Sequence, residues 1–294
     1  MDRGKNSTNI NWYPGHMAKT KRQIIDDLKV IDVVIELLDA RIPLASKNPD
    51  FDNLIKNKKR IIVLNKADLT DMNENKKWIE YFAQKGIPAL AVDSNSGRGI
   101  EKVTKEIEKI MQPELEKLQA KGIVRKTIRV MILGIPNVGK SSFINRIAKK
   151  TTMEVGNRPG VTRQKQWIRI SKQIELQDTP GVLWPKFDEE TGLKLAYTGS
   201  IKDEILDRVD VAYNLTKILV NNFRKSLQER YNISDEEFEV CKSNSNYALQ
   251  FMYLIGRKRG ALISGGEIDL ERTSGIILDD FRSGKTGKIT IEVV

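Results

Sequence analysis

Residues 134–141 have the composition and spacing of a loop that holds phosphate. Their sequence is GIPNVGKS, the pattern G-x-x-x-x-G-K-S, and it follows an apolar run at 128–133. Glycine lets successive backbone N–H groups face one anion, and a following helix adds the partial positive charge of its N-terminus. We expect Lys140 to pair with the β- and γ-phosphates of a nucleotide and Ser141 to bind Mg²⁺. The expected nucleotide contacts in this segment are Asn137, Val138, Gly139, Lys140, Ser141 and Ser142.

A second group of residues suits the recognition of guanine. Asn65, Lys66 and Asp68 form the pattern N-K-x-D directly after an apolar run at 61–64. The Asp68 carboxylate can accept hydrogen bonds from guanine N1–H and the 2-amino group, whereas adenine would leave it buried without a partner. Such obligatory hydrogen bonds reject the wrong ligand by a factor on the order of 10⁴. Asn65 would support the loop or contact the base, and Lys66 would cover the base with its aliphatic stem.

Five more residues have chemistry that fits the base, the metal or the γ-phosphate. Ser94 and Asn95 would present backbone N–H groups to the guanine 6-oxo group, although an ordinary turn is an alternative. Thr162 offers a hydroxyl and a backbone N–H to Mg²⁺ and the γ-phosphate. Asp178 offers a carboxylate to the metal, usually through water, and Gly181 offers its N–H to the γ-phosphate. Contacts of this kind order switch loops while the γ-phosphate is present.

The residue after Gly181 bears on how water would be activated. Many small GTPases place a water-orienting glutamine there, whereas this chain has Val182, which cannot orient water by hydrogen bonding. Slow intrinsic hydrolysis is therefore expected. His16 is the single histidine and a candidate catalyst, since an unperturbed imidazole has a pKa of about 6.5. A helix cap and an RNA contact are equally open interpretations of His16.

The elements that must position these residues alternate between strands and helices up to residue 185, which predicts a mostly parallel sheet covered on both faces. Beyond it, helical periodicity predicts a separate, mainly helical domain, so the expected domains are 1–185 and 186–294. Expected strands lie at 32–38, 61–64, 87–92, 128–133, 166–170 and 173–177, and expected helices at 18–30, 75–84, 99–111, 113–122 and 142–149. In the second domain we expect helices at 191–206, 209–228, 235–240 and 244–258, and a tail with a helix followed by a strand at 289–294.

Composition points to a polyanionic partner. The net charge is +11, but residues 186–294 carry 16 Lys and Arg against 18 Asp and Glu, so the positive charge lies in the first 185 residues. Excess positive charge of this size indicates nucleic acid or an anionic surface as partner, with a well-solvated lysine-rich surface as the alternative. With a single cysteine there can be no internal disulfide, and the short, interrupted apolar runs argue against membrane association. We expect a cytoplasmic protein.

Two basic clusters in the second domain are candidate phosphate contacts. They are Arg257, Lys258 and Arg259 in one and Arg282, Lys285 and Lys288 in the other. Phosphate contacts supply most sequence-independent affinity for nucleic acid. The net charge of −2 in this part favours local patches over indiscriminate binding, and a solvated charged face is the alternative.

These motifs carry a family resemblance. The five motifs are those of translation-factor-type GTPases, but the base-recognition motifs precede the phosphate loop and the switch motifs, so the chain resembles a circularly permuted GTPase. With residues 12–17 (WYPGHM), 39–41 (DAR) and 281–285 (FRSGK), it resembles the ribosome biogenesis GTPase A family. The resemblance implies a permuted P-loop GTPase fold with GTP/GDP and Mg²⁺ as ligands. Asn137 is similar to the asparagine of potassium-dependent GTPases, which implies K⁺, with a loop-stabilising amide as the alternative.

The resemblance also implies a function. It implies a role in late assembly of the bacterial large (50S) ribosomal subunit, with the second domain binding 23S rRNA; ribosomal proteins are further partners, and a monomer is expected. One alternative is an RNA-binding checkpoint on another ribosomal particle, and another is a nucleotide-gated scaffold without hydrolysis. Because the chain enters the second domain after Gly181, the helix at 18–30 must fill the place that this permutation leaves empty. His16 should then lie near the switch at 178–181.

Overall fold

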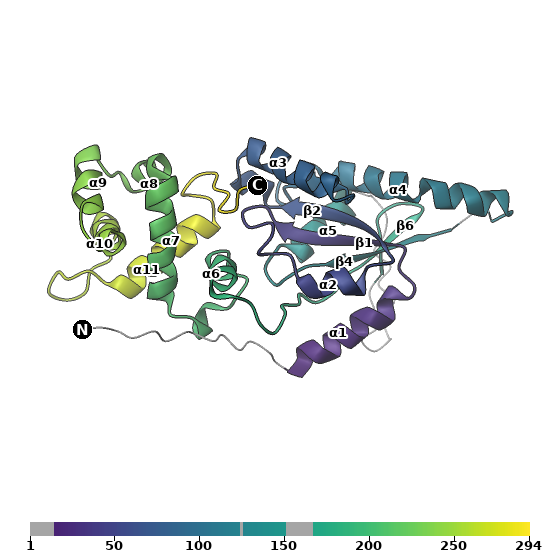
Figure 1. The fold of residues 1–294 in the computed structure, drawn as a ribbon, viewed down its shortest axis with the longest axis horizontal. Coiled ribbons are helices and arrows are strands. Elements are labelled where there is room, and N and C mark those ends of the chain that lie inside the picture. Colours follow the sequence, from purple (N-terminus) through teal and green to yellow (C-terminus); the bar gives the residue numbers. More distant parts are fainter. Residues whose placement is uncertain (1–14, 124–125, 151–166) are drawn as a thin grey trace. The chain divides into compact units, whose positions relative to one another are not determined.

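The computed structural model describes residues 15–123, 126–150 and 167–294, with side chains for all of these but 15–18 and 150. Two compact units divide the chain (Figure 1). Unit 1 runs up to Asp68 and includes Met72–Phe187 and Glu292–Val294, and unit 2 comprises Leu69–Asp71 and Asp188–Ile291. Among the described helices, none has the length and apolarity that crossing a bilayer would require.

Unit 1 contains a six-stranded sheet in the order β3-β2-β1-β4-β6-β5 among the described residues. All neighbours are parallel except β5 and β6, which pair antiparallel in the region where strands were expected at 166–170 and 173–177. The strands are β1 (Val33–Asp39), β2 (Lys59–Asn65), β3 (Ala89–Ala91), β4 (Ile128–Leu133), β5 (Trp167–Arg169) and β6 (Ile174–Gln177). β1 is buried along its whole length, as expected for an interior strand of a parallel sheet.

Helices cover both faces of this sheet, which confirms the predicted fold class. On one face there are two apolar clusters. In the first, Ile24 and Leu28 of the N-terminal helix pack against Met131 and Leu133. In the second, Trp78 and Phe82 pack against Ile62 and Leu64. α4 contacts β2 and α5. The helices of unit 1 are α1 (Gly15–Leu28), α2 (Pro49–Leu54), α3 (Met72–Gln84), α4 (Ile100–Ala120) and α5 (Lys140–Lys150), with a short 3-10 turn, η1 (Ala67–Leu69), at the boundary of the units.

Unit 2 is helical in its described residues, and its core contains Leu215, Phe251, Ile277 and Phe281. Its helices are α6 (Glu189–Tyr197), α7 (Arg208–Asn222), α8 (Arg224–Tyr231), α9 (Asp235–Lys242), α10 (Tyr247–Arg259) and α11 (Leu270–Arg282), with a 3-10 turn, η2 (Asp203–Ile205). Ser234 and Glu237 form a reciprocal capping box at the start of α9, so that boundary is encoded locally.

Several predicted elements were wrong. Pro113 does not begin a new helix but lies inside α4, where it leaves an exposed turn with one fewer backbone hydrogen bond. The helix predicted at 191–206 ends at Tyr197 because Gly199 adopts a left-handed φ of 73°. The one predicted at 209–228 divides into α7 and α8 at Phe223, whose φ and ψ of −134° and 42° are not helical.

The tail predicted as a strand at 289–294 is not one, and it serves a different purpose. The Glu292 carboxylate accepts from the backbone N–H of Leu44 at 2.6 Å and of Ala45 at 3.1 Å. The Glu292 carbonyl accepts from Trp78 Nε1 at 3.1 Å. Glu292 is 8% exposed and belongs to unit 1, so a residue at the far end of the sequence stabilises the loop after β1.

This arrangement predicts that Glu292→Gln destabilises the protein. An amide can accept only one of the two hydrogen bonds well, and the other N–H group loses a charged acceptor, which costs about 1–3 kcal/mol in the free energy of unfolding. Chemical denaturation monitored by Trp fluorescence measures this change. Glu108→Gln on the exposed face of α4 is the matched control. Equal midpoints for the two variants would contradict the stabilising role of Glu292.

Candidate functional site

The phosphate loop connects the buried strand β4 to α5, the context expected for a nucleotide loop. A hollow of about 670 Å³ lies over it, lined by Lys66, Pro136, Asn137, Gly139, Lys140, Ser141, Ser142, Asp178, Thr179, Pro180 and Gly181. The Lys140 ammonium donates to the carbonyl oxygens of Gly134 at 3.2 Å and Ile135 at 2.9 Å. Burial lowers the pKa of Lys140 to about 8, against the opposing effect of the Asp178 charge. The hollow therefore contains a partly desolvated cation at its floor.

Asn65 joins the base-recognition segment to the phosphate loop. Its Nδ2 donates to the Val138 carbonyl at 2.8 Å, and its Oδ1 accepts from Ser94 Oγ at 2.6 Å. Gly139 has a φ of 98°, and a Cβ built there would lie 2.3 Å from Asn65 Nδ2. Only glycine meets both requirements at this position. Three segments that were predicted separately from the sequence thus meet at one side-chain amide.

Asp68 has the unpaired acceptor that a guanine would satisfy. Its Oδ1 is buried and has no hydrogen-bond partner among the described residues. Burial raises the pKa of Asp68, and the neighbouring Asp93 carboxylate raises it further. A ligand that donates two N–H groups would remove this penalty, since hydrogen bonds to a carboxylate favour its charged form. The residues present therefore fit a guanine base.

The loop that contains Ser94 and Asn95 is organised by a residue that the sequence analysis missed. Asp93 Oδ1 accepts from the backbone N–H of Asn95 at 2.8 Å and of Ser96 at 3.1 Å. Burial opposes ionisation of Asp93, but the hydrogen bonds from the Ser96 hydroxyl and from these two N–H groups lower its pKa. The Asn95 N–H already donates to Asp93, so its predicted contact with a base would require that this hydrogen bond be shared or exchanged. The Ser94 N–H has no described acceptor, so it is the group left for the guanine 6-oxo oxygen.

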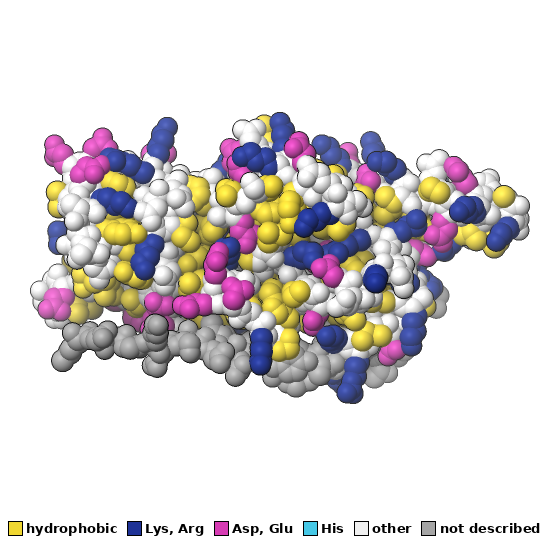
Figure 2. Space-filling model, in the orientation of Figure 1, with side chains coloured by type: hydrophobic (Ala, Val, Ile, Leu, Met, Phe, Trp, Pro, Cys, Tyr) yellow, Lys and Arg dark blue, Asp and Glu magenta, His cyan; other side chains and the backbone are white. Residues whose placement is uncertain are grey.

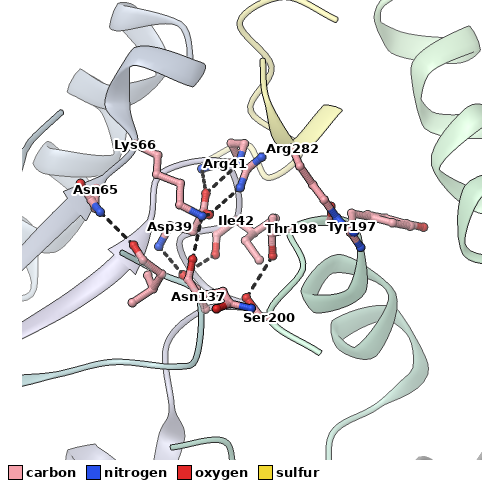
Figure 3. Close-up of polar contacts among 12 residues, drawn as sticks. Asp39, Arg41, Ile42, Asn65, Lys66, Asn137, Tyr197, Thr198, Ser200 and Arg282 are labelled. Carbon is pink, nitrogen blue, oxygen red and sulfur yellow. Dashed lines mark hydrogen bonds and ion pairs between the residues drawn. The ribbon is translucent and has the colours of Figure 1, made fainter. Parts of the chain in front are cut away.

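Lys66 is held in place by a buried carboxylate. Its Nζ lies 3.0 Å from Asp39 Oδ2 and donates to the Asn137 carbonyl at 2.8 Å, with its amine between the two residues (Figure 3). Asp39 also accepts from Arg41 Nε at 2.9 Å and Nη2 at 2.7 Å. Burial opposes ionisation, but the charges of Arg41 and Lys66 hold the pKa of Asp39 well below its usual range. Sequence spacing alone could not indicate that the motif at 39–41 holds Lys66 in place.

Asp178 and Gly181 lie at the other side of the hollow. A Cβ at Gly181 would lie 2.8 Å from Lys140 Nζ and 2.8 Å from the backbone of Pro136. Only glycine therefore lets the segment at 178–181 lie this close to the phosphate loop. Burial raises the pKa of Asp178 and the charge of Lys140 lowers it. One carboxylate and the Ser141 hydroxyl beside a phosphate site fit Mg²⁺, which usually takes one or two carboxylates with substrate phosphates. K⁺ has one candidate here, Asn137, whose φ of 57° is left-handed.

Val182 connects the switch segment at 178–181 to α1. It packs in the same buried cluster as Ile24 and Leu28 of α1. Its N–H donates to the Gly134 carbonyl at 3.2 Å, and its carbonyl accepts from Asn48 Nδ2 at 3.1 Å. Gln177 Nε2 donates to Asp27 Oδ2 at 2.7 Å in the same region. The N-terminal helix therefore packs against the switch segment, as expected from the permuted order.

The expected catalytic residues Thr162 and His16 have no described side chain. Thr162 lies outside the described residues. His16 is in the first turn of α1, but its side chain is not among those described. The geometry around the γ-phosphate position therefore rests on Lys140, Asp178 and Gly181.

The predicted basic clusters of unit 2 divide into paired and unpaired residues. Arg282 makes two contacts with Asp203, at 2.7 and 2.8 Å, and donates to two carbonyl groups at the end of α6. Lys258 pairs with Glu237 at 2.7 Å, and Arg259 donates to the Arg230 carbonyl at 2.6 Å. Arg282 and Lys258 are therefore paired with carboxylates within unit 2, whereas the hydrogen bond of Arg259 to a carbonyl leaves its charge uncompensated. The exposed cations left for phosphate are Arg257, Arg259, Lys285 and Lys288, and Lys285 lies 4.0 Å from the Asp280 carboxylate.

Comparisons with known proteins agree with this geometry. A family model described as 50S ribosome-binding GTPase matches residues 129–246. Ribosome biogenesis GTPase A of Bacillus cereus is 45% identical over 96% of this chain and 93% of its own length. The chain belongs to the ribosome biogenesis GTPase A family. It is a GTPase that acts in ribosome assembly.

Further relatives are more distant in sequence. The family member of Thermotoga maritima is 31% identical over 96% of this chain and 94% of its own length. The crystal structure of GNP-bound YlqF from T. maritima is similar at a TM-score of 0.65 and 28% identity, covering 94% of this chain and 98% of that one. A GDP-bound structure of YlqF gives the same TM-score. These structures support nucleotide binding by the family.

The unpaired Asp68 oxygen predicts the base preference of this GTPase. Asp68→Asn should shift preference from GTP toward XTP, because an amide can donate to the xanthine 2-oxo group. We expect the affinity for GTP to fall by a factor on the order of 10² or more, given two lost charge-assisted hydrogen bonds. Competition against a fluorescent GDP analogue measures both affinities. Equal binding of ATP and GTP by the wild type would disprove the base-recognition assignment.

The position of Lys140 predicts proton uptake on nucleotide binding. With a pKa of about 8, Lys140 is half-charged at pH 8, and bound phosphate favours the charged form. Binding of GDP at that pH should therefore take up about half a proton, and affinity should fall as pH rises above 8. Calorimetry in two buffers of different ionisation enthalpy measures the uptake. Lys140→Arg stays charged and serves as the control; zero uptake by the wild type would contradict the assignment.

Proposed function

We propose that this chain is a GTP-hydrolysing assembly factor for the bacterial large (50S) ribosomal subunit, which it contacts through 23S rRNA during late maturation. The observation that supports this most is the Asn65 amide, which holds the base-recognition and phosphate segments together as one guanine-nucleotide site. Family membership supplies the connection to the ribosome. In this proposal, residues 1–185 form the GTPase domain and residues 186–294 the RNA-binding domain.

The chemistry is mainly positioning and charge stabilisation. Lys140 would exchange its loop carbonyls for phosphate oxygens, and Gly181 would donate its N–H to the γ-phosphate. Ser141, Asp178 and Thr162 would hold Mg²⁺, which neutralises charge on the phosphates when bound. Lys66, fixed by Asp39, would lie along the base. The described members of this set, Lys66, Lys140, Ser141, Asp178 and Gly181, already line one hollow, so the proposal requires little rearrangement of the backbone around them.

Activation of water is assigned to His16 rather than to Val182. Val182 is 6% exposed and lies in an apolar cluster, so its side chain has no way to orient water. His16 is in the first turn of α1, whose later residues Ile24 and Leu28 pack in the cluster with Val182, and a position of His16 near the switch segment is part of this proposal. We also include K⁺ at Asn137 as a source of the positive charge that an arginine finger would supply.

Nucleotide state would control RNA contact through the chain that leaves the switch. Val182 and its neighbours lead through Trp184 and Pro185 into unit 2, where Arg257, Arg259, Lys285 and Lys288 are the phosphate contacts. Ordering of the switch by the γ-phosphate would therefore favour one state for RNA binding. Linkage requires that GTP strengthen particle binding as much as the particle strengthens GTP binding. The protein acts as a monomer in the cytoplasm in this proposal.

Turnover of GTP by the full-length protein, with and without purified large ribosomal subunits, tests the proposal. Large subunits should stimulate hydrolysis, and replacement of K⁺ by Na⁺ should slow it. His16→Ala should lower the stimulated rate by roughly 10²-fold while leaving GTP affinity unchanged, as expected for general acid–base help.

Each alternative has its own outcome in this experiment. Stimulation by small subunits and not by large ones would favour a checkpoint on another particle. Nucleotide-dependent binding without hydrolysis would favour a scaffold. Equal rates in K⁺ and Na⁺ would remove K⁺ from the proposal. Deleting everything after Pro185 is not a clean test, because it also removes Glu292 from unit 1.

A further inference from the structure

Unit 1 has a second hollow, at the opposite end of β2 from the nucleotide residues. Its volume is about 450 Å³, and its lining is strongly basic, with Lys56, Lys58, Lys59 and Arg60 against one acidic residue, Asp52. Ile55, Ile87, Pro88 and Ile110 complete its apolar floor. Lys and Arg side chains gather on this face of unit 1 between α2 and α4 (Figure 2).

The charges of this hollow are not balanced by its own residues. Arg60 is paired with Asp52 at 2.7 Å and with the buried Glu36, so it is neutralised and holds the fold. Lys58 donates to the Ile31 carbonyl at 2.8 Å, which leaves its charge uncompensated. Lys56 and Lys59 have no hydrogen bond or ion pair with any described residue. Three lysine charges therefore face one concavity without a counter-ion.

We propose that this basic hollow is an RNA-binding site that holds backbone phosphates, separate from the nucleotide site and from the cations of unit 2. Lysine binds phosphate as a point charge, and apolar side chains between the lysines can contact sugars. A membrane surface is disfavoured, because membrane binding by a helix needs apolar side chains that project outward, whereas these line a concavity. The inference rests on the proposed function, since it assigns part of the rRNA contact to the GTPase domain.

The two sites are far enough apart to be tested independently. Lys59 and Asn65 are the first and last residues of β2, and six steps along a strand span about 20 Å. Neither Lys56 nor Lys59 belongs to the nucleotide machinery described above. Removing their charges should leave nucleotide binding as it is.

The test compares Lys56→Gln/Lys59→Gln with the wild type and with Lys76→Gln/Lys105→Gln. The control removes the same charge from exposed lysines of α3 and α4 outside the hollow. Binding to deproteinised large-subunit rRNA is measured over a range of salt concentrations, and binding to intact large subunits by sedimentation. Two lost phosphate contacts should weaken rRNA binding about 25- to 60-fold near 0.1 M salt and reduce the slope of log K against log salt by about 1.4–1.8. Affinity for GDP should stay within about twofold in all three proteins.

The outcomes separate this inference from the proposed function. If the wild type binds rRNA and particles and the hollow variant matches it, this site does not exist while the proposed function stands. The same conclusion follows if the control loses as much affinity, because net charge would then be responsible. Loss of binding to intact particles but not to deproteinised rRNA would identify an acidic protein as the partner and overturn the RNA assignment. A wild type that binds neither probe would overturn both proposals.

Discussion

The Asn65 side chain is the constraint on which the nucleotide site depends. Its amide donates to the phosphate loop and accepts from Ser94, so two loops at the carboxyl ends of neighbouring strands are fixed to a third. The close approach of Gly139 follows from this, because any side chain there would displace the amide. Asn65 and Val138 are 73 residues apart, and α3, β3, α4 and β4 lie between them in the sequence. The site is therefore a property of tertiary structure that one polar residue maintains.

Much of this architecture could be predicted from the sequence because local chemistry encoded it. The glycine spacing at 134–141 and the apolar runs before each motif predicted the ends of these strands to within one residue. What escaped prediction were pairings between side chains distant in sequence. Asp39 and Arg41 are only two residues apart, so their ion pair is local. The role of this pair is to hold Lys66, and no sequence periodicity indicates that Lys66 contacts Asp39. Short α2, with Asn48 as its cap and a proline at its start, lay below the length at which apolar patterns are informative.

The switch segment is held by packing on one side and by hydrogen bonds on the other. Val182 lies in the core with α1, while Gly181 contacts the phosphate loop so closely that a Cβ has no room. A γ-phosphate that pulls on Gly181 would therefore act on a backbone already joined to α1 through one buried residue. Under the proposed function, this junction is where a local contact with the γ-phosphate would produce a larger rearrangement. Arg282 was expected to bind phosphate, but its guanidinium is paired with Asp203 and stabilises unit 2.

The position of Glu292 has a consequence for the order of events during synthesis. The Leu44 N–H and the carboxylate that accepts from it are 248 residues apart in sequence. During translation the loop after β1 is synthesised early. Its N–H groups have no Glu292 carboxylate to bond with until the residues between Leu44 and Glu292 have been translated. Contacts of such long sequence separation form late and slow folding, because chain entropy must be lost before they contribute. A nascent chain of this protein therefore carries an unfinished GTPase fold through most of its own translation, and unit 2 has to be made before unit 1 can be completed.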